Sequence, residues 1–192
     1  MDERMNIARS ELILGGQKSG KSRRAEDLAR AWLAQPGRRA CLLATAQPWD
    51  DEMRERISRH QRDRAERVPG MSTLEVGAGL VEVLVRESRP DTLLVVDCLT
   101  LWLTAGLMPM AGDPWSADEL DAQQANLVDA LGRAPGPVVI VSNEIGLGVI
   151  PMGRDVRAFV DALGRLNQRV AGVCERVIFM AAGLPMVLKG NT

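Results

Sequence analysis

Tyrosine is absent from this sequence, and phenylalanine and tryptophan together supply only 3% of its residues. Proteins that bind single-stranded nucleic acid stack bases on aromatic side chains, so this shortage argues against that class. The formal net charge is −1, from 24 basic and 25 acidic residues, and gives no electrostatic signature of nucleic-acid or anionic-membrane binding. The sequence therefore predicts no nucleic-acid partner.

Long hydrophobic runs are also missing, because charged residues or glycines interrupt every apolar stretch before it reaches membrane-spanning length. The first ten residues mix acidic and basic side chains and lack an apolar core, so we expect no secretion signal. The three cysteines are far apart and lack the spacing of a metal site. We therefore expect free thiols in a reducing compartment, and a cytoplasmic protein without a membrane span.

A glycine-rich stretch that contains a lysine and a serine lies near the beginning of the chain. Residues 15–22 read GGQKSGKS and match G-x-x-x-x-G-K-[ST] at all four fixed positions. An apolar run at 12–14 precedes this stretch and a helical pattern at 23–33 follows it, which is the context of a phosphate-binding loop. In such a loop, backbone N–H groups surround the phosphates, Lys21 reaches the β- and γ-phosphates, and Ser22 offers its hydroxyl to Mg²⁺. The sequence therefore predicts a nucleoside triphosphate site.

Short apolar runs alternate with helical patterns along the chain. The runs cover 12–14, 40–44, 93–96, 138–141 and 177–181, with an edge strand expected at 72–76 and a terminal strand at 185–189. Helices are expected at 23–33, 50–67, 80–86, 99–107, from a capping box at Ser116 to about residue 131, and at 155–173. This alternation is typical of a doubly wound α/β fold with a parallel sheet. We expect an N-terminal extension at 1–10 and a single domain at 11–192.

Ligands in such folds bind at the carboxyl ends of the strands, so the residues that follow each run are candidates for function. They include Thr45, Asp97 and the segment 142–144. Asp97 closes an apolar strand, which is the Walker B arrangement that holds Mg²⁺ directly or through water.

His60 is the only histidine in the chain, and it lies in the charged helix expected at 50–67. A lone histidine on a helix is more often a surface residue than a catalyst. A neutral imidazole beside a bound triphosphate can, however, attack the α-phosphorus, and neighbouring arginines can stabilise the phosphoryl charge. The residues alone leave both interpretations open.

Several further stretches follow in a fixed order. They are ATAQ at 44–47, DEM at 51–53 followed by Arg56, Ile57 and His60, Thr73 with Glu75, VVDCLTLWLT at 95–104, VSNEIGLGVIP at 141–151 and GRLNQRVA at 164–171. Any one of these is common, but the ordered set resembles the bifunctional adenosylcobinamide kinase / adenosylcobinamide-phosphate guanylyltransferase family of cobalamin biosynthesis. The resemblance extends from about residue 12 to residue 189.

This resemblance implies a RecA-like P-loop NTPase fold, with a mainly parallel central sheet and helices on both faces. It also implies two reactions: ATP or GTP phosphorylates adenosylcobinamide, and GMP from GTP then passes through a guanylylated His60 to give adenosylcobinamide-GDP. The nucleotide contacts that carry over from the family are Gly15, Gly16, Gln17, Lys18, Ser19, Gly20, Lys21, Ser22, Ala44, Thr45, Ala46, Gln61, Arg62, Asp63, Arg64, Glu75 and Asp97. Ser22 and Asp97 are the expected Mg²⁺ ligands, and Glu144 and Asp97 are candidates for orienting the substrate hydroxyl.

The expected partners are the corrinoid substrate, ATP and GTP, with Mg²⁺ as the cofactor and no organic prosthetic group. The family also implies a homotrimer.

Two alternative functions belong to other classes of protein. A regulatory GTP or ATP switch is disfavoured because no Asn-Lys-x-Asp motif is present, since Glu144 follows Asn143. A RecA-like motor on DNA is disfavoured by the near-zero charge and the scarce aromatics.

Overall fold

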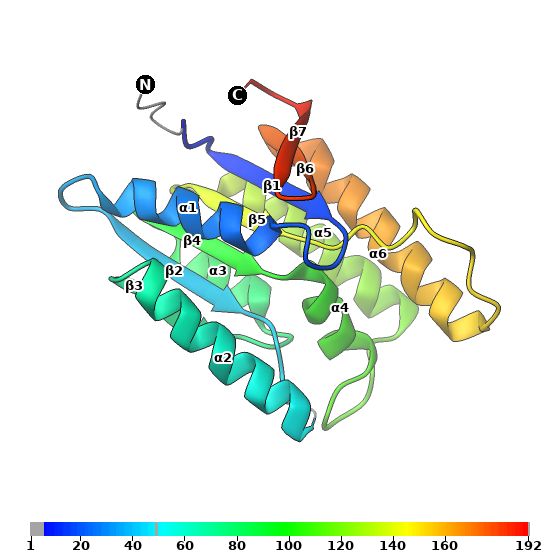
Figure 1. Ribbon diagram of the computed structural model, residues 1–192. Helices are drawn as coiled ribbons and strands as arrows, with labels where there is room; N and C mark the ends of the chain where they lie inside the picture. The colour runs from blue at the N-terminus through cyan, green and yellow to red at the C-terminus, as the bar shows by residue number, and fades with distance from the viewer. Residues whose placement is uncertain (1–5, 49, 192) are drawn as a thin grey trace.

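The structure, a computed structural model, describes residues 6–48 and 50–191 (Figure 1). Its centre is a seven-stranded sheet in the order β3-β2-β4-β5-β1-β6-β7. The strands are β1 (Ser10–Gly15), β2 (Arg39–Ala44), β3 (Met71–Glu75), β4 (Thr92–Asp97), β5 (Val138–Val141), β6 (Arg176–Ala181) and β7 (Leu184–Lys189). Strands β1 to β6 run parallel, and β7 pairs antiparallel with β6. The mainly parallel α/β fold predicted from the sequence is confirmed.

The helices are α1 (Lys21–Leu33), α2 (Asp51–Arg67), α3 (Leu80–Glu87), α4 (Leu99–Leu107), α5 (Ala117–Arg133) and α6 (Arg154–Val173). The predicted capping box opens α5: Ser116 Oγ accepts from the N–H of Glu119, whose carboxylate accepts from the N–H of Ser116. At the N-terminus, Ser10, the last residue of the expected extension, is the first residue of β1. Residues 1–5 of that extension lie outside the described residues.

Helix α1 begins two residues earlier than the apolar pattern predicts. Gly20, at φ 101°, adopts a left-handed conformation that lets the loop turn directly into the helix. As a result, Lys21 and Ser22 lie in the first turn of α1, where the N-terminal end of the helix dipole favours anions.

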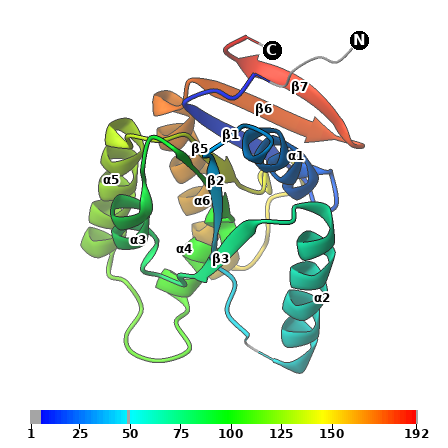
Figure 2. The ribbon, with the colours of Figure 1, turned by 90° about the vertical axis from the view of Figure 1, so that its left-hand side faces the viewer.

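Helices cover both faces of the sheet. Helices α1 and α2 lie on one side, and α3, α5 and α6 lie on the other (Figure 2). Successive strand residues point to opposite faces, so Ile13 and Leu42 pack with α1 while Leu12 and Leu43 pack with α3 to α6. This two-sided burial is the reason for the short, nearly continuous apolar runs in the sequence.

The two edges of the sheet are less covered than its centre. At one edge β3 has no fully buried residue, which agrees with the edge strand predicted there. At the other edge every residue of β7 is exposed. Helix α2 is also peripheral, since none of its described side chains is fully buried. The burial thus concentrates around β1, β4 and β5, the strands that carry the predicted phosphate site.

The carboxyl ends of the parallel strands lie level with one another. Ala44 pairs in register with both Glu75 and Asp97, and Asp97 pairs with Val141. Backbone hydrogen bonds continue the ladder beyond the strands, from Thr45 N to Asp97 O and from Ser142 N to Ile13 O. The segments expected to bind ligand therefore gather along one edge of the molecule, next to the loop between β1 and α1.

Candidate functional site

The glycine-rich loop lies between β1 and α1 and packs closely against the end of β6. Gly15 has φ 150°, and a Cβ atom at this position would lie 2.4 Å from Met180 O. The turn between β6 and β7 supports the loop as well, because Gly183 N donates to Ser19 O at 3.0 Å. Only glycine fits at position 15, and the backbone of the loop is held from outside.

Lys21 and Ser19 place polar groups inside this loop. The Lys21 ammonium donates to Gly16 O at 2.6 Å, so the side chain folds back over the loop. Burial lowers the pKa of Lys21, and the neighbouring Cys98 and Asp97 act in the opposite direction. Ser19 Oγ is buried, and no hydrogen-bond partner for it occurs in the part of the chain that the structure describes. The loop therefore holds a desolvated cation and a spare hydroxyl, which suit an anion.

Asp97 closes β4 and is fixed from behind by Thr45. The hydroxyl of Thr45 is fully buried; it donates to Cys98 O at 2.7 Å and accepts from Cys98 N at 2.8 Å. Burial raises the pKa of the Cys98 thiol to about 11. The Thr45 hydroxyl thus makes both of these hydrogen bonds within the protein and fixes the backbone directly after Asp97.

The residues of α2 that are predicted to contact nucleotide lie on a helix that is bonded to two neighbouring elements, β3 and α1. Gln61 Nε2 donates to Glu75 Oε1 at 3.3 Å, which joins the helix to the edge strand β3. Toward its end, α2 is joined to α1 through Glu26, which pairs with Arg67 at 2.7 Å and with Arg64 at 3.9 Å. His60 is exposed on α2, one turn before Arg64. The helix that carries the candidate nucleophile is therefore tied to the helix that begins in the phosphate loop.

Glu26 was not predicted from the sequence. It is 7% exposed, and burial raises its pKa while the charges of Arg67 and Arg64 lower it. The sequence did offer a signal for it, since Glu26 follows Ala25 and lies among small apolar positions of α1. An acid buried at such a position needs a cationic partner.

A polar network orders the chain after β5. Ser142 Oγ donates to Asn167 Oδ1 at 2.7 Å, and Asn167 Nδ2 donates to Asn143 O at 3.1 Å. Asn143 in turn donates to Thr100 Oγ1 from its backbone N–H at 3.2 Å and from its amide at 3.0 Å. Thr100 and Asn167 were also not predicted, although each is a polar residue in an otherwise apolar helical pattern.

Glu144, the candidate for orienting the substrate hydroxyl, lies directly beside the phosphate loop. Its backbone N–H donates to Gly15 O at 3.1 Å. Its carboxylate accepts from Gly146 N at 2.8 Å, which caps the following turn. The segment after β5 therefore begins at the loop and runs outward from it.

The remaining predicted contacts are placed as follows: Gly16, Gln17, Lys18, Gly20 and Ser22 lie in or directly after the loop, Ala44 and Ala46 at the end of β2, and Arg62 and Asp63 on α2. Asp63 pairs with Arg67 at 3.3 Å.

Among residues 6–48 and 50–191, no three His, Cys, Asp or Glu residues form a group able to hold a metal. No helix in that part of the chain is long and apolar enough to cross a membrane.

Comparisons with known proteins identify relatives of this chain. A family model described as cobinamide kinase / cobinamide phosphate guanyltransferase matches residues 11–188. The bifunctional adenosylcobalamin biosynthesis protein CobP of Pseudomonas aeruginosa is 47% identical over 181 residues, with 94% of this chain and 98% of that protein covered. The CobU proteins of Escherichia coli and Salmonella typhimurium are 32% and 33% identical, each over 93% of this chain and 98% of that protein.

A solved Pyrococcus horikoshii OT3 protein shares the fold, with a TM-score of 0.53 at 11% identity over 100% of this chain and 91% of that one. The match of a family model to nearly the whole chain, together with a relative at 47% identity, confirms the family predicted from the ordered motifs. The chain belongs to the cobinamide kinase / cobinamide phosphate guanyltransferase family.

Proposed function

We propose that this protein phosphorylates adenosylcobinamide with ATP or GTP and then transfers GMP from GTP to the new phosphate through a guanylylated His60. The observation that carries the proposal is the phosphate loop at residues 15–22, whose Lys21 is 7% exposed and folds back over the loop to donate to Gly16 O. Residues 11–192 would act as one kinase and guanylyltransferase domain, and the family match over 11–188 supports this.

The kinase step needs mainly positioning and charge neutralisation. The substrate hydroxyl oxygen attacks the γ-phosphorus, the bond to the β,γ-bridging oxygen breaks, the nucleoside diphosphate leaves, and the hydroxyl proton passes to water. Backbone N–H groups of the loop and the Lys21 ammonium stabilise the negative charge that develops on the phosphoryl oxygens. Asp97 and Glu144 are the carboxylates available to orient the attacking hydroxyl.

The donor set at the loop fits Mg²⁺, which would be held by Ser22 and Asp97. Mg²⁺ prefers oxygen ligands and is bound by one or two protein groups together with substrate phosphates, rather than by a complete protein cage. A hydroxyl and a single carboxylate beside a phosphate loop match that pattern, and the described residues hold no larger ligand cluster. When bound, the ion screens the phosphate charge.

In the guanylyl half, an imidazole nitrogen of His60 attacks the α-phosphorus of GTP. A P–N bond forms, the bond to the α,β-bridging oxygen breaks, and pyrophosphate leaves. An oxygen of the cobinamide phosphate then attacks the same phosphorus, the P–N bond breaks, and the imidazole is recovered. The adjacent Arg62 and Arg64 are proposed to stabilise the phosphoryl charge, and Gln61, Asp63, Glu75 and residues 44–46 are proposed nucleotide contacts.

Labelling with GTP that carries the label on the α-phosphorus tests the covalent step. Wild-type protein is expected to keep the label after denaturation, and the label should be lost in acid and retained in alkali, as for a phosphoramidate. The chain has one histidine, so any histidine-bound label assigns the site directly. His60→Ala should lose the label and guanylyl transfer yet still phosphorylate the corrinoid, and a chase with adenosylcobinamide phosphate should discharge the wild-type label.

The same experiment separates the proposal from its alternatives. A regulatory switch or a motor leaves no label on the denatured chain. Retention of wild-type labelling in His60→Ala would refute the histidine relay. Loss of corrinoid phosphorylation in His60→Ala, at unchanged stability, would refute the assignment of the two steps to different groups.

The proposal also covers the oligomeric state and the cellular location. We expect a homotrimer, so sedimentation should give a mass of about 63 kDa, three times the 20.9 kDa of one chain. A monomer or dimer mass would refute this. We also expect a cytoplasmic location, which the three buried free cysteines favour.

A further inference from the structure

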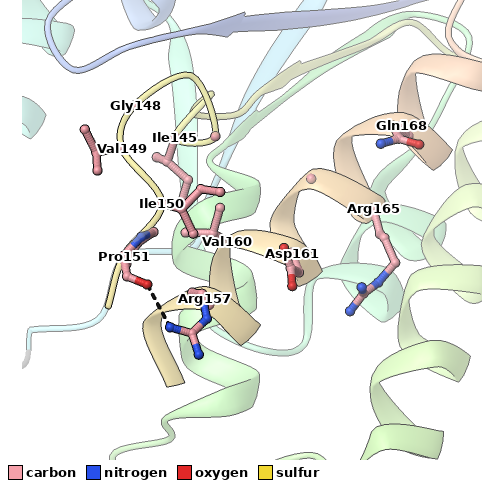
Figure 3. A pocket seen from close by; sticks show the side chains of 12 residues that line it. Ile145, Gly148, Val149, Ile150, Pro151, Arg157, Val160, Asp161, Arg165 and Gln168 are labelled. Atoms are coloured by element: carbon pink, nitrogen blue, oxygen red, sulfur yellow. Dashed lines mark hydrogen bonds between the residues drawn. The ribbon is translucent and has the colours of Figure 1, made fainter. Parts of the chain in front are cut away.

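A groove lies between the chain after β5 and one face of α6, outside the nucleotide site described above. It encloses a cavity of about 400 Å³ and is lined by residues of the segment 145–151 and by α6 residues from Arg157 to Gln168. Figure 3 shows Ile145 and Ile150 on the loop side, with Arg157, Asp161, Arg165 and Gln168 following one another along the helix.

The loop side of the groove belongs to an exposed apolar segment, residues 145–152. In it Leu147 is 77% exposed, Val149 96%, Ile150 75% and Met152 93%. Apolar side chains concentrated in this way on one surface usually mark a binding site. The segment is nevertheless held in place, because Arg157 donates to Pro151 O at 3.0 Å and also to Met152 O.

The apolar segment starts at the phosphate loop. Glu144 donates its N–H to Gly15 O, and Ile145, the next residue, already lines the groove. The preceding Asn143 is fixed by Thr100 and Asn167. The lining of the groove therefore begins one residue after a backbone contact with the phosphate loop.

The helix side of the groove is polar and mixed in charge. Arg157, Asp161, Arg165 and Gln168 follow at helical spacing, so donors and acceptors alternate along the face. Gly164 lies among them without a side chain, and a Cβ atom there would meet nothing within 4 Å. The groove thus combines an apolar wall, an open floor and groups that can pair with neutral amides.

We propose that this groove and the apolar segment bind the corrin macrocycle of the cobinamide substrate. The inference rests on the proposed function, which supplies the substrate class. A corrin ring presents apolar faces and edges, and carries amide side chains around its rim together with the arm that ends in the reacting hydroxyl. The apolar segment covers the ring, the α6 residues pair with its amides, and the arm extends past Glu144 to the phosphate loop.

Two substitutions with matched controls test this inference. Ile150→Asp puts a charge on the apolar wall, and Val85→Asp puts the same charge on an exposed apolar site of α3. Gly164→Leu fills the floor of the groove, and Gly172→Leu adds the same side chain where a Cβ is equally unhindered on the same helix. The measurements are cobinamide binding by ultrafiltration and absorbance, the KM values for cobinamide and for ATP, and the sedimenting mass.

Ile150→Asp and Gly164→Leu should each weaken cobinamide binding and raise its KM by about tenfold or more, with the KM for ATP and the sedimenting mass unchanged. Val85→Asp and Gly172→Leu should match wild type. Unchanged cobinamide binding in both groove variants would overturn the inference. A change of sedimenting mass in the groove variants would also overturn it, because a second copy of the chain would then cover this surface. Wild-type protein that neither binds nor phosphorylates cobinamide would instead refute the proposed function.

Discussion

Gly15 and Gly16 are neighbours in the phosphate loop, but their surroundings differ. A Cβ atom at Gly15 would lie 2.4 Å from Met180 O and 2.7 Å from Ser19 Oγ, whereas one at Gly16 would meet nothing within 4 Å. Gly15→Ala is therefore expected to destabilise the protein by about 1–3 kcal/mol and to displace the loop. Urea unfolding and nucleotide binding measure the two effects.

Gly16→Ala is the control for this prediction, because it makes the same chemical change in open space. It should change the free energy of unfolding by about 0.5 kcal/mol or less. Equal destabilisation by the two variants would show that the close approach to β6 does not determine the residue at position 15.

The cysteines give a prediction about pH. Burial raises the pKa of Cys98 to about 11 and that of Cys174 to about 12, and it also raises the pKa of Cys41. The thiolate is the reactive form, and at about pH 8 a thiol of pKa about 11 is only about 0.1% ionised. The native protein should therefore resist iodoacetamide at this pH, and reactivity should rise as the pH approaches the raised pKa values.

Intact-mass measurement after iodoacetamide treatment checks this expectation. The denatured chain should gain three adducts, one for each cysteine. Rapid modification of the folded protein near neutral pH would contradict the burial of these thiols.

Site residues could be predicted from the sequence where a local motif specifies them. The proposed roles of Lys21 and Ser22 follow from their spacing from Gly15, so eight consecutive residues suffice to propose them. Glu26 differs, because its partner Arg67 lies 41 positions away and nothing local connects the two. Thr45 was a candidate from its place after an apolar run and a nucleotide contact from the resemblance, and neither signal reveals that its hydroxyl bonds to Cys98.

At the scale of elements, the attachment of α2 to the rest of the fold is a testable feature, because this helix carries the proposed nucleophile His60. Glu26 is 7% exposed and is bonded to Arg67, with Arg64 close by. Glu26→Gln removes the charge that these two arginines face. We expect a loss of about 1–3 kcal/mol in the free energy of unfolding and a larger loss of guanylyl transfer than of phosphoryl transfer, since only guanylyl transfer is proposed to use a residue of α2 as nucleophile.

Asp27→Asn provides the matched control on the same helix. Asp27 pairs with Arg30 and Arg23, whose side chains are 56% and 58% exposed, so the loss should be below about 1 kcal/mol. Both variants are compared by chemical unfolding and by the two transfer assays. Equal loss of both transfers in Glu26→Gln would show that the link between α1 and α2 does not act specifically on His60.

Elements were predicted well where burial produces a pattern. The strands β2, β4 and β5 are buried on both faces, and each appears in the sequence as an apolar run of about its true length. The start of α1 was placed two residues late, because Lys21 and Ser22 interrupt the apolar pattern although Gly20 already permits the helix to begin. The last strand was predicted, but its antiparallel direction depends on the tight turn at Ala182 and Gly183, both at positive φ.

At the scale of the whole molecule, the distribution of exposed apolar side chains could not be predicted. The residues of β7 and those of 145–152 are as apolar in the sequence as the core strands. Their exposure follows from topology: β7 is an edge strand, and the segment after β5 leaves the sheet beside the phosphate loop. Composition counts apolar residues, whereas strand order decides which of them are covered.

The strand order also places β1, which leads into the phosphate loop, inside the sheet between β5 and β6, so ligand binding at the loop should stabilise the entire fold. A ligand that binds only the native state at about 100 times its Kd adds about 2.7 kcal/mol of stability. For a chain of this size that corresponds to a rise in Tm of about 5–11 °C. Addition of ATP or GTP with Mg²⁺ should produce this shift in a thermal melt, and EDTA should reduce it, since the phosphate charge is then no longer screened. Lys21→Ala should largely abolish the shift.

Lys189→Ala is the control for this prediction. It removes a lysine that donates to Ala171 O and Gly172 O at the end of α6, so we expect it to lower the starting Tm while keeping the nucleotide shift. An equal nucleotide shift in Lys21→Ala and wild type would place the triphosphate elsewhere on the molecule.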